Sequence, residues 1–336
     1  MEPSSPSSFL KNRISALSQL STWYRSLLND EDHPVWFRCS QENAFFTEDS
    51  IRLALTTWAD ALTESGLAEW ASSYSIPEQN EQVVGVVAAG NIPLVGLHDV
   101  LCVLLAGFRL QVKPSSSDRY LMVETLQFLE QLPEFSGRIA WVEKLSGYHK
   151  VIATGSNNTN RYFEVYFRHV PALLRGNRNS VGILTGDETK EELTNLGKDV
   201  FTYFGLGCRS ISKLLVPRGY SFNALFEAWE HFSEIKNHFK YFNNYEYHLA
   251  GYLVNQIPFL SNDWVIIKED ENWSSPIGVV SYSVYDSLEE ANQLLETHGK
   301  HIQCVVGKGH LPIGSAQFPK LNDYADRVDT LAFLLA

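Results

Sequence analysis

The chain has 336 residues, enough for one to three domains, and its 44% hydrophobic and 20% charged residues are typical of a globular protein. Its formal net charge of -12 argues against a nucleic-acid partner, because phosphate binding normally requires a basic face. No apolar run reaches the length of a membrane span, and the N-terminus lacks a signal-peptide pattern. The cysteines at 39, 102, 208 and 304 form no Cys-x-x-Cys pair, so we expect reduced thiols, no metal site and a cytoplasmic location.

The pattern of the chain changes at residue 83. Before it, helical spacing predicts a helix over 15–28, and Thr47 is placed to start a second helix that ends at 61. Val83–Val87 is a β-branched run typical of a buried parallel strand. Alternating helices and strands follow, which indicates a doubly wound α/β sheet with right-handed crossovers. We expect helices over 94–107 and 117–132, and strands over 109–114, 137–141, 150–153 and 180–184.

A second α/β segment starts near Asp187. Ser287 is the expected N-cap of its last helix, and the tail over 311–336 has no clear period. We expect helices over 188–204, 222–239, 246–254 and 288–298, and strands over 212–216, 264–267, 278–283 and 302–306.

Cys208 is the candidate nucleophile. Gly205 and Gly207 precede it between a helix and a strand, and they allow a tight turn that presents the thiol together with its own backbone N–H. Acyl transfer needs both groups, a nucleophile and a donor for the developing oxyanion. Arg209 would favour the thiolate if it faced the sulfur. The alternative is a small buried cysteine, which describes most cysteines in proteins.

Three short motifs follow three predicted strands at their carboxyl ends, where open α/β sheets bind ligands. The first, Gly-Asn-Ile-Pro, offers the amide of Asn91 as an oxyanion donor. In the others, a lysine can hold a ribose or phosphate, and a glycine turn can place a pyrophosphate at a helix N-terminus. Each triplet alone is more often an ordinary turn. The predicted cofactor-binding residues are Lys113, Ser115, Thr154, Gly155 and Ser156.

The order and spacing of these motifs resemble the aldehyde dehydrogenase superfamily. In that family a strand is followed by W-N-x-P, then come K-P-S, T-G-S and the G-Q-x-C segment that holds the catalytic cysteine. The segment from Gly205 to Cys208 fits the last motif, with Leu206 in place of the glutamine. Gly-Val-Val from 278 and Ser-Leu-Glu-Glu-Ala from 287 are similar to the family's G-P-V and S-x-E-E-A. The resemblance covers residues 83–307; the first 80 residues match only as a helical layer, and the tail does not match the usual family ending.

Two departures from the family pattern point to one branch of it. Oxidising members carry a glutamate in an E-L-G-G-K segment, which activates water to hydrolyse the thioester, whereas the equivalent stretch here, 174–180, has no acid. The ribose-binding glutamate of the family is also missing, and Ser274-Ser275-Pro276 stands near its place. With its short length, the chain resembles the acyl-CoA reductase group, the relatives of the fatty acid reductase of bacterial luminescence.

The resemblance implies an aldehyde-dehydrogenase-like fold, with two doubly wound α/β domains and the active site between them. It divides the chain into a helical layer of the cofactor domain (1–80), a dinucleotide-binding α/β domain (81–180), a catalytic cysteine domain (181–310), and a tail (311–336) that returns to the cofactor domain or to an interface.

The implied function is that of an acyl-CoA reductase, which makes an aldehyde through a Cys208 acyl-enzyme. Asn91 and the Cys208 N–H stabilise the oxyanion, NADPH gives the hydride, with NADH as the alternative, and coenzyme A leaves. His169 is a candidate acid, although a structural histidine is the stronger reading. The aromatic run over 239–245 suggests either an acyl tunnel or ordinary core, of which core is favoured.

Other possibilities stay open on the sequence alone. The chain could instead be an aldehyde dehydrogenase that works in the oxidising direction, against which the acid-free stretch argues. It could also be a non-catalytic nucleotide-binding relative, which the missing ribose glutamate keeps open. A homo-oligomer or a partner enzyme that consumes the aldehyde is compatible with the sequence.

Overall fold

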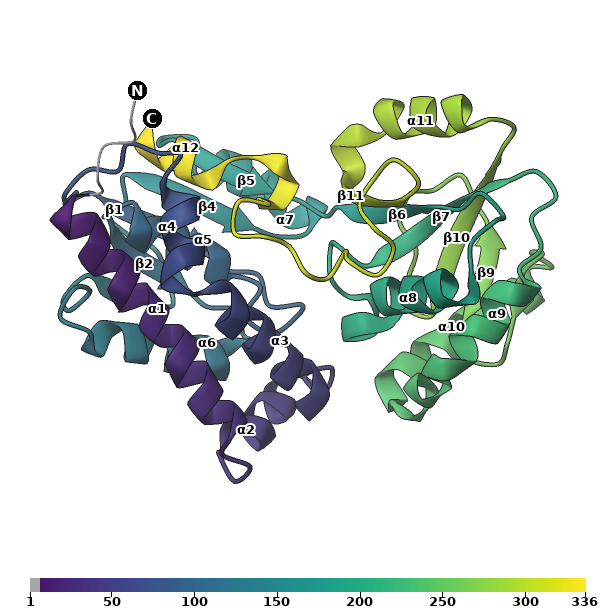
Figure 1. The fold of residues 1–336 in the computed structure, drawn as a ribbon, viewed down its shortest axis with the longest axis horizontal. Helices are drawn as coiled ribbons and strands as arrows, with labels where there is room; N and C mark the ends of the chain where they lie inside the picture. Colours follow the sequence, from purple (N-terminus) through teal and green to yellow (C-terminus); the bar gives the residue numbers. More distant parts are fainter. Residues whose placement is uncertain (1–6) are drawn as a thin grey trace. The chain divides into compact units, whose positions relative to one another are not determined.

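The computed structural model describes residues 7–336 and divides into two compact units, coloured along the chain in Figure 1. Unit 1 consists of residues up to 176 together with 320–336, and unit 2 of residues 177–319. The N-terminal stretch in which no signal peptide was found begins with residues 1–6, which lie outside the described range. Among the described residues, none of the helices has the length and apolar character needed to cross a membrane.

Unit 1 begins with a layer of four helices. The first starts at Ser8, earlier than the expected residue 15, because the Ser7 hydroxyl accepts a hydrogen bond from the N–H of Leu10 and caps it. Thr47 caps the third helix through the N–H of Ser50, as predicted. The four helices are α1 (Ser8–Leu28), α2 (Val35–Glu42), α3 (Glu48–Ala61) and α4 (Glu64–Ala71).

The sheet of unit 1 has five parallel strands in the order β3-β2-β1-β4-β5. Helices α5 and α6 connect its first three strands, and together with the N-terminal layer they bury one face of the sheet in a single apolar cluster. The other face carries a smaller cluster around Val151 and Phe167. The elements are β1 (Val83–Val87), α5 (Leu97–Leu105), β2 (Arg109–Lys113), α6 (Arg119–Gln131), β3 (Ile139–Trp141), β4 (Lys150–Thr154), α7 (Asn157–Tyr166) and β5 (Ala172–Arg175).

Residues 320–336 of the C-terminal tail pack in unit 1, whereas 311–319 belong to unit 2. The tail ends in a short helix, α12 (Thr330–Leu335), which the sequence pattern did not predict. The hydroxyl of Tyr324 accepts a 2.8 Å hydrogen bond from the indole N–H of Trp70. The ammonium of Lys150 donates to the carbonyls of Phe333 and Leu334, at 3.2 and 2.8 Å. These contacts tie residues 320–336 to the helical layer and to the sheet.

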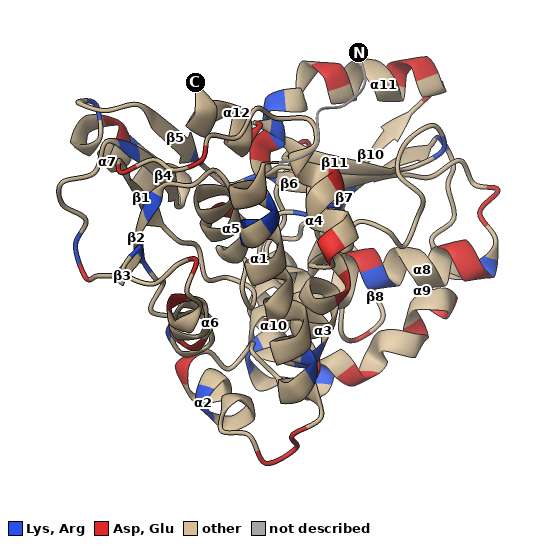
Figure 2. Cartoon of the chain, turned by 60° about the vertical axis from the view of Figure 1, so that its left-hand side comes forward, with Lys and Arg blue, Asp and Glu red and all other residues tan. Residues whose placement is uncertain are grey.

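The sheet of unit 2 has six strands in the order β11-β6-β7-β10-β9-β8, parallel except for the antiparallel edge strand β8. Helices α8 and α9 cover one face, and α11 covers the other. Acidic residues lie in the first turns of α8 and α11, where carboxylates face the positive end of the helix dipole (Figure 2). The elements are β6 (Asn179–Ile183), α8 (Lys190–Phe201), β7 (Ile211–Pro217), α9 (Asn223–Trp229), α10 (Phe239–Val254), β8 (Leu260–Ser261), β9 (Ile266–Glu269), β10 (Val279–Tyr285), α11 (Leu288–Thr297) and β11 (Ile302–Gly307).

The expected α/β class with two sheet-containing units is confirmed, although one of the predicted helices is wrong. The single helix expected over 222–239 is two shorter segments, because α9 ends at Trp229 and 3-10 turns run over Glu230–Asn237. His238 then caps α10 by accepting the N–H of Tyr241 on its Nδ1. The aromatic run over 239–245 therefore forms the first turns of α10.

Candidate active site

The sheet order of unit 1 brings the predicted cofactor residues to one edge. The chain builds β1, β2 and β3 outward in one direction and then returns to place β4 on the other side of β1. The carboxyl ends of β1 and β4 therefore flank the point where the strand order reverses, which is where open α/β sheets bind ligands. The motifs that contain Asn91, Lys113 and Thr154 all follow strands at this edge.

The loop that carries Asn91 is held against the turn after β2. Asn91 itself is exposed. A Cβ on Gly90 would lie 2.4 Å from the Cβ and Oγ of Ser115, so only glycine allows this approach. Further along the loop, Leu94 has a left-handed φ of 57°, and its N–H donates a 2.8 Å hydrogen bond to Oδ2 of Asp118. The backbone that presents Asn91 is thus pinned at both ends.

Asp118 is a residue of this edge that the sequence analysis missed. Its side chain is buried, and burial raises the pKa of its carboxyl well above the ordinary range. Its Oδ1 is buried without a hydrogen-bond partner. Its position just before α6 suggests an ordinary N-cap, yet its side chain makes no capping bond and holds the Leu94 N–H instead.

The Thr154-Gly155-Ser156 turn leads directly into α7. The hydroxyl of Ser156 caps this helix by accepting the N–H of Thr159 at 3.2 Å. A Cβ on Gly155 would lie 3.0 Å from side-chain atoms of both Thr159 and Phe163, so glycine lets the turn pack closely on the helix. Lys113 is exposed at the end of β2. This edge therefore combines a helix N-terminus with an exposed cation, the features that suit a phosphate group.

Cys208 lies in unit 2, on the loop that leads from α8 into β7. Tyr203 and Phe204 both have left-handed backbone angles, with φ of 54° and 58°, and Gly205 follows with φ of 76°. Non-glycine residues in this region each cost about 1–3 kcal/mol, and such strain gathers at functional sites. Cys208 is half-buried, whereas the other three cysteines are buried.

Main-chain and side-chain bonds fix the loop around Cys208. The N–H of Ser210 donates to the carbonyl of Gly207 at 3.0 Å and closes a turn around the cysteine. The Oγ of Ser180, at the start of β6, donates to the carbonyl of Cys208 at 2.9 Å. The Nε of Arg209 donates to the carbonyl of Ala316 at 2.5 Å, so this side of the guanidinium is held by residues that follow β11.

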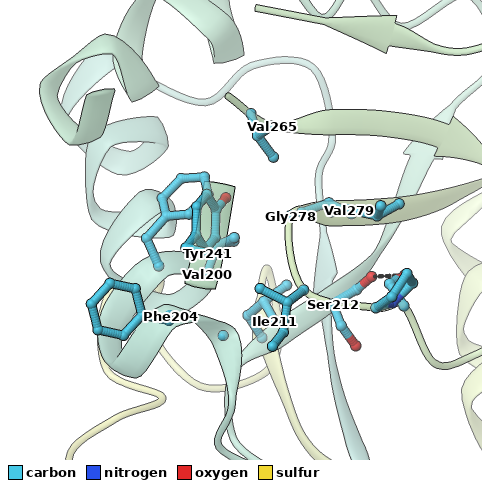
Figure 3. Close-up of a pocket in the computed structure, with 14 residues that line it drawn as sticks. Val200, Phe204, Ile211, Ser212, Tyr241, Val265, Gly278 and Val279 are labelled. Atoms are coloured by element: carbon cyan, nitrogen blue, oxygen red, sulfur yellow. Dashed lines mark hydrogen bonds between the residues drawn. The ribbon is translucent and has the colours of Figure 1, made fainter. Parts of the chain in front are cut away.

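An apolar pocket lies beside this loop in unit 2 (Figure 3). It contains about 320 Å³ of empty space, part of it open to solvent. Gly205 and Ile211, one on each side of Cys208 in the sequence, both line it. Gly278 lines it from the turn before β10, and Tyr241 lines it from α10. In the aromatic run over 239–245, for which core was the favoured interpretation, Tyr241 and Tyr245 are buried, and Tyr241 also lines this pocket.

The acid-free stretch over 174–180 contains a buried cation, Arg175 of β5. Arg175 is 3% exposed, and its Nη1 donates to both oxygens of Asp99 at 2.6 and 2.7 Å. Its Nη2 donates to the hydroxyl of Thr330 at 2.6 Å. Asp99, the carboxylate next to this stretch, therefore has both of its oxygens hydrogen-bonded to Arg175. His169, the candidate acid, is exposed before the amino end of β5, at the edge opposite the cofactor motifs.

Within residues 7–336, no three His, Cys, Asp or Glu side chains gather in a metal-binding arrangement.

No protein-family model matches the sequence, and no curated protein is similar to it in sequence. Solved structures are similar in fold. A putative aldehyde dehydrogenase from Burkholderia cenocepacia has a TM-score of 0.63 at 16% identity, over 85% of this chain and 72% of that one.

Two further structures give the same result. The NAD-dependent aldehyde dehydrogenase from Sinorhizobium meliloti has a TM-score of 0.64 at 14% identity, over 85% of this chain and 67% of its own. Lactaldehyde dehydrogenase from Escherichia coli has a TM-score of 0.60 at 14% identity, over 85% and 71%. The chain therefore has the aldehyde dehydrogenase fold, as the sequence motifs predicted.

Proposed function

We propose that this chain, with its aldehyde dehydrogenase fold, is an NADPH-dependent acyl-CoA reductase that uses Cys208 as its nucleophile. The observation that carries the proposal is the strained turn over Tyr203–Gly205, which leads to the one cysteine that is not buried. Backbone strain of this kind persists only where the surrounding structure holds it in place. A cysteine that only fills space in the core does not require a strained turn before it.

The reaction begins with the Cys208 thiolate, which attacks the carbonyl carbon of the acyl thioester. A new carbon–sulfur bond forms, the bond to the coenzyme A sulfur breaks, and coenzyme A leaves as a thiolate that takes up a proton. The backbone N–H of Cys208 and the amide of Asn91 donate to the oxyanion at this step. When bound, NADPH supplies the hydride that reduces the enzyme-bound thioester. Cys208 is then released as a thiolate, and the aldehyde leaves.

The edge of unit 1 fits a dinucleotide. Gly155 allows the turn to pack on α7, and the first N–H groups of that helix favour a pyrophosphate. We propose that Thr154, Gly155 and Ser156 hold the phosphates, and that Lys113 and Ser115 hold the ribose at the end of the neighbouring strand. NADH is the alternative cofactor, since no residue here identifies a 2′-phosphate.

Thioester reduction is preferred to aldehyde oxidation because the base that activates water is missing. The stretch over 174–180 has no acid, and Asp99 nearby is held by Arg175. An acyl-enzyme without such a base hydrolyses slowly and exchanges with a thiol instead. Most of the side chains that line the pocket beside the Cys208 loop are apolar, which suits an apolar acyl group next to the thiol.

The test is to mix the protein with NADPH and acyl-CoAs of varied chain length, and to follow NADPH absorbance together with aldehyde. We expect aldehyde in equal amount to NADPH consumed, and a loss of more than about 10³-fold in Cys208→Ala, which has no nucleophile. Cys39→Ser, at a buried thiol of unit 1, is the control and should keep the activity. Turnover by Cys208→Ala, or steady acid formation from aldehyde without coenzyme A, would overturn the proposal.

A further inference from the structure

Asp199 is a buried carboxylate in the last turn of α8, and the reaction above does not use it. Its side chain has no exposed surface. Its two oxygens accept hydrogen bonds from the main-chain N–H of Gly314 at 2.6 Å and of Ala316 at 2.9 Å. We call residues 312–317, which contain both donors, the strap.

The position of Asp199 is unfavourable for a carboxylate. It lies at the C-terminal end of a helix, where the dipole repels negative charge, and it is removed from water. Burial raises its pKa to about 6, although the two strap N–H groups and the charges of Arg209 and Lys198 act in the opposite direction. The hydrogen bonds from the strap to the Asp199 carboxylate offset part of the free-energy cost of burying it, so the strap explains why an aspartate is present here.

The strap connects Asp199 to the two residues that follow Cys208. The carbonyl of Ala316 accepts the Nε of Arg209 at 2.5 Å. The side-chain amide of Gln317 donates both to the carbonyl of Asp199, at 3.2 Å, and to the hydroxyl of Ser210, at 3.4 Å. The strap therefore fixes the loop from its far side, while Ser180 holds the carbonyl of Cys208.

The strap also lies too close to α8 to shift without repacking. Gly314 has a φ of 92°, and a Cβ at this position would lie 2.8 Å from the Cβ of Asn195. Glycine is thus required both by the backbone angle and by the contact. With this geometry the two N–H groups of the strap point at one carboxylate, and either a shorter side chain or one with a single acceptor would leave one of them unpaired.

We infer that Asp199 is a positioning residue for Cys208: by holding the strap it fixes Arg209 and Ser210, and with them the direction of the thiol and of the Cys208 N–H. The inference rests on the proposed function for its kinetic readout, while its structural readout needs no substrate. It assigns no chemical step to Asp199.

The test compares Asp199→Asn with the wild-type protein. In asparagine an NH2 group replaces one of the two carboxylate oxygens, so one strap N–H loses its acceptor. We therefore expect faster hydrogen exchange in the strap and in residues 203–211, measured by mass spectrometry of the free protein. We expect kcat for aldehyde formation to fall about 10- to 100-fold with little change in KM, since a misplaced nucleophile slows the chemical step. Gln317→Met is a milder change and should shift both readouts in the same direction. It provides the test if Asp199→Asn does not fold.

A pH series separates positioning from simple packing. Below about pH 6 the carboxyl of Asp199 takes up a proton and loses acceptor strength, so strap exchange in the wild type, corrected for intrinsic rates, should rise there. In Asp199→Asn this rise should be absent. The charged groups that face Asp199 are Arg209 from the Cys208 loop and Lys198 from its own helix.

The matched control is Asp329→Asn in unit 1. Asp329 also accepts a main-chain N–H, from Ala332 at 2.8 Å, and a hydroxyl hydrogen, from Tyr74 at 2.7 Å. The Asp329→Asn variant should have a lower Tm than the wild type, with unchanged kcat and unchanged hydrogen exchange in residues 203–211. Unchanged exchange and kcat in both Asp199→Asn and Gln317→Met would overturn the inference. If the wild type reduced no acyl-CoA while exchange still rose in Asp199→Asn, the proposed function would fail and the bracing of the loop would stand.

Discussion

The two units present their candidate residues from opposite ends of their strands. In unit 1 the motifs follow the carboxyl ends of β1, β2 and β4, and one of them leads into a helix N-terminus. In unit 2 Cys208 precedes the amino end of β7, and Gly278 lines the pocket just before the amino end of β10. The first arrangement suits an anionic cofactor, and the second suits a nucleophile with an adjacent N–H.

The units also differ in how they bury a cation. Arg175 in unit 1 is paired with Asp99. Lys213 in unit 2, five residues after Cys208, is fully buried, donates to the main-chain carbonyl of Asp270 and lies over the ring of Trp273 at 5.9 Å. When one partner of a buried ion pair is removed, the other charge stays buried without its partner, and this destabilises the folded protein. A buried charge that is hydrogen-bonded only to a neutral carbonyl leaves no such charge behind, and its own burial is a net cost in folding free energy. The difference predicts opposite effects of removing the two cations.

The largest effect on stability is expected at Arg175. Arg175→Met leaves Asp99 buried without its partner, and breaking a buried pair from one side costs about 3–5 kcal/mol. Urea unfolding at pH 7 measures the change. A loss of less than about 1 kcal/mol would show that Arg175 does not join α5 and the tail to the sheet as its contacts indicate.

Asn91→Ala tests the unit 1 side of the proposed chemistry. Removal of one oxyanion donor reduces kcat about 10²–10³-fold. Because Asn91 is exposed, Tm should stay the same. Steady-state kinetics with acyl-CoA give the result, and a variant with an unchanged kcat would remove Asn91 from the mechanism.

Lys213→Met should stabilise the protein at pH 7. Burial lowers the pKa of Lys213 to about 8 from an ordinary value of 10.5, so the folded protein disfavours its charge by about 3 kcal/mol. That cost is full below pH 8 and fades as the pH rises to 10.5, so the gain in Lys213→Met should fade over the same range. The carbonyl of Asp270 keeps a donor in the hydroxyl of Ser283. Thermal unfolding at pH 7 and at pH 10 checks both the sign and the window.

The smallest effect is expected at Gly155. Gly155→Val puts side-chain atoms where Thr159 and Phe163 already lie, so the turn must move, and KM for NADPH should rise about 10-fold, equivalent to about 1.4 kcal/mol. Gly251→Ala in α10 is the control, because a Cβ there meets nothing within 4 Å. If Gly155→Val binds NADPH as tightly as the control, the turn is not part of the cofactor site.

The sequence allowed the prediction of features that are local in the chain. The caps at Thr47 and Ser287 are confirmed, because an N-cap depends on residues three positions apart. The order of the loops after successive strands predicted the edge of unit 1, since parallel strands end on one side.

Contacts between residues far apart in the sequence could not be predicted, because they leave no local pattern. Asp199 meets Gly314 and Ala316 across more than 100 residues, and no local pattern marks such a contact. The left-handed angles of Tyr203 and Phe204 were also unpredictable, because aromatic residues rarely adopt them without tertiary support. The roles of Cys208, Asn91 and the cofactor residues stay predictions.

The most direct measurement of the central claim is to incubate the protein with an acyl-CoA in the absence of NADPH, and then to analyse its peptides by mass spectrometry at a pH that preserves thioesters. We predict one acyl group on the peptide that contains Cys208, removed by added coenzyme A and absent in Cys208→Ala. An unmodified Cys208 beside intact acyl-CoA, or an acyl group on Cys39, Cys102 or Cys304 instead, would contradict the account.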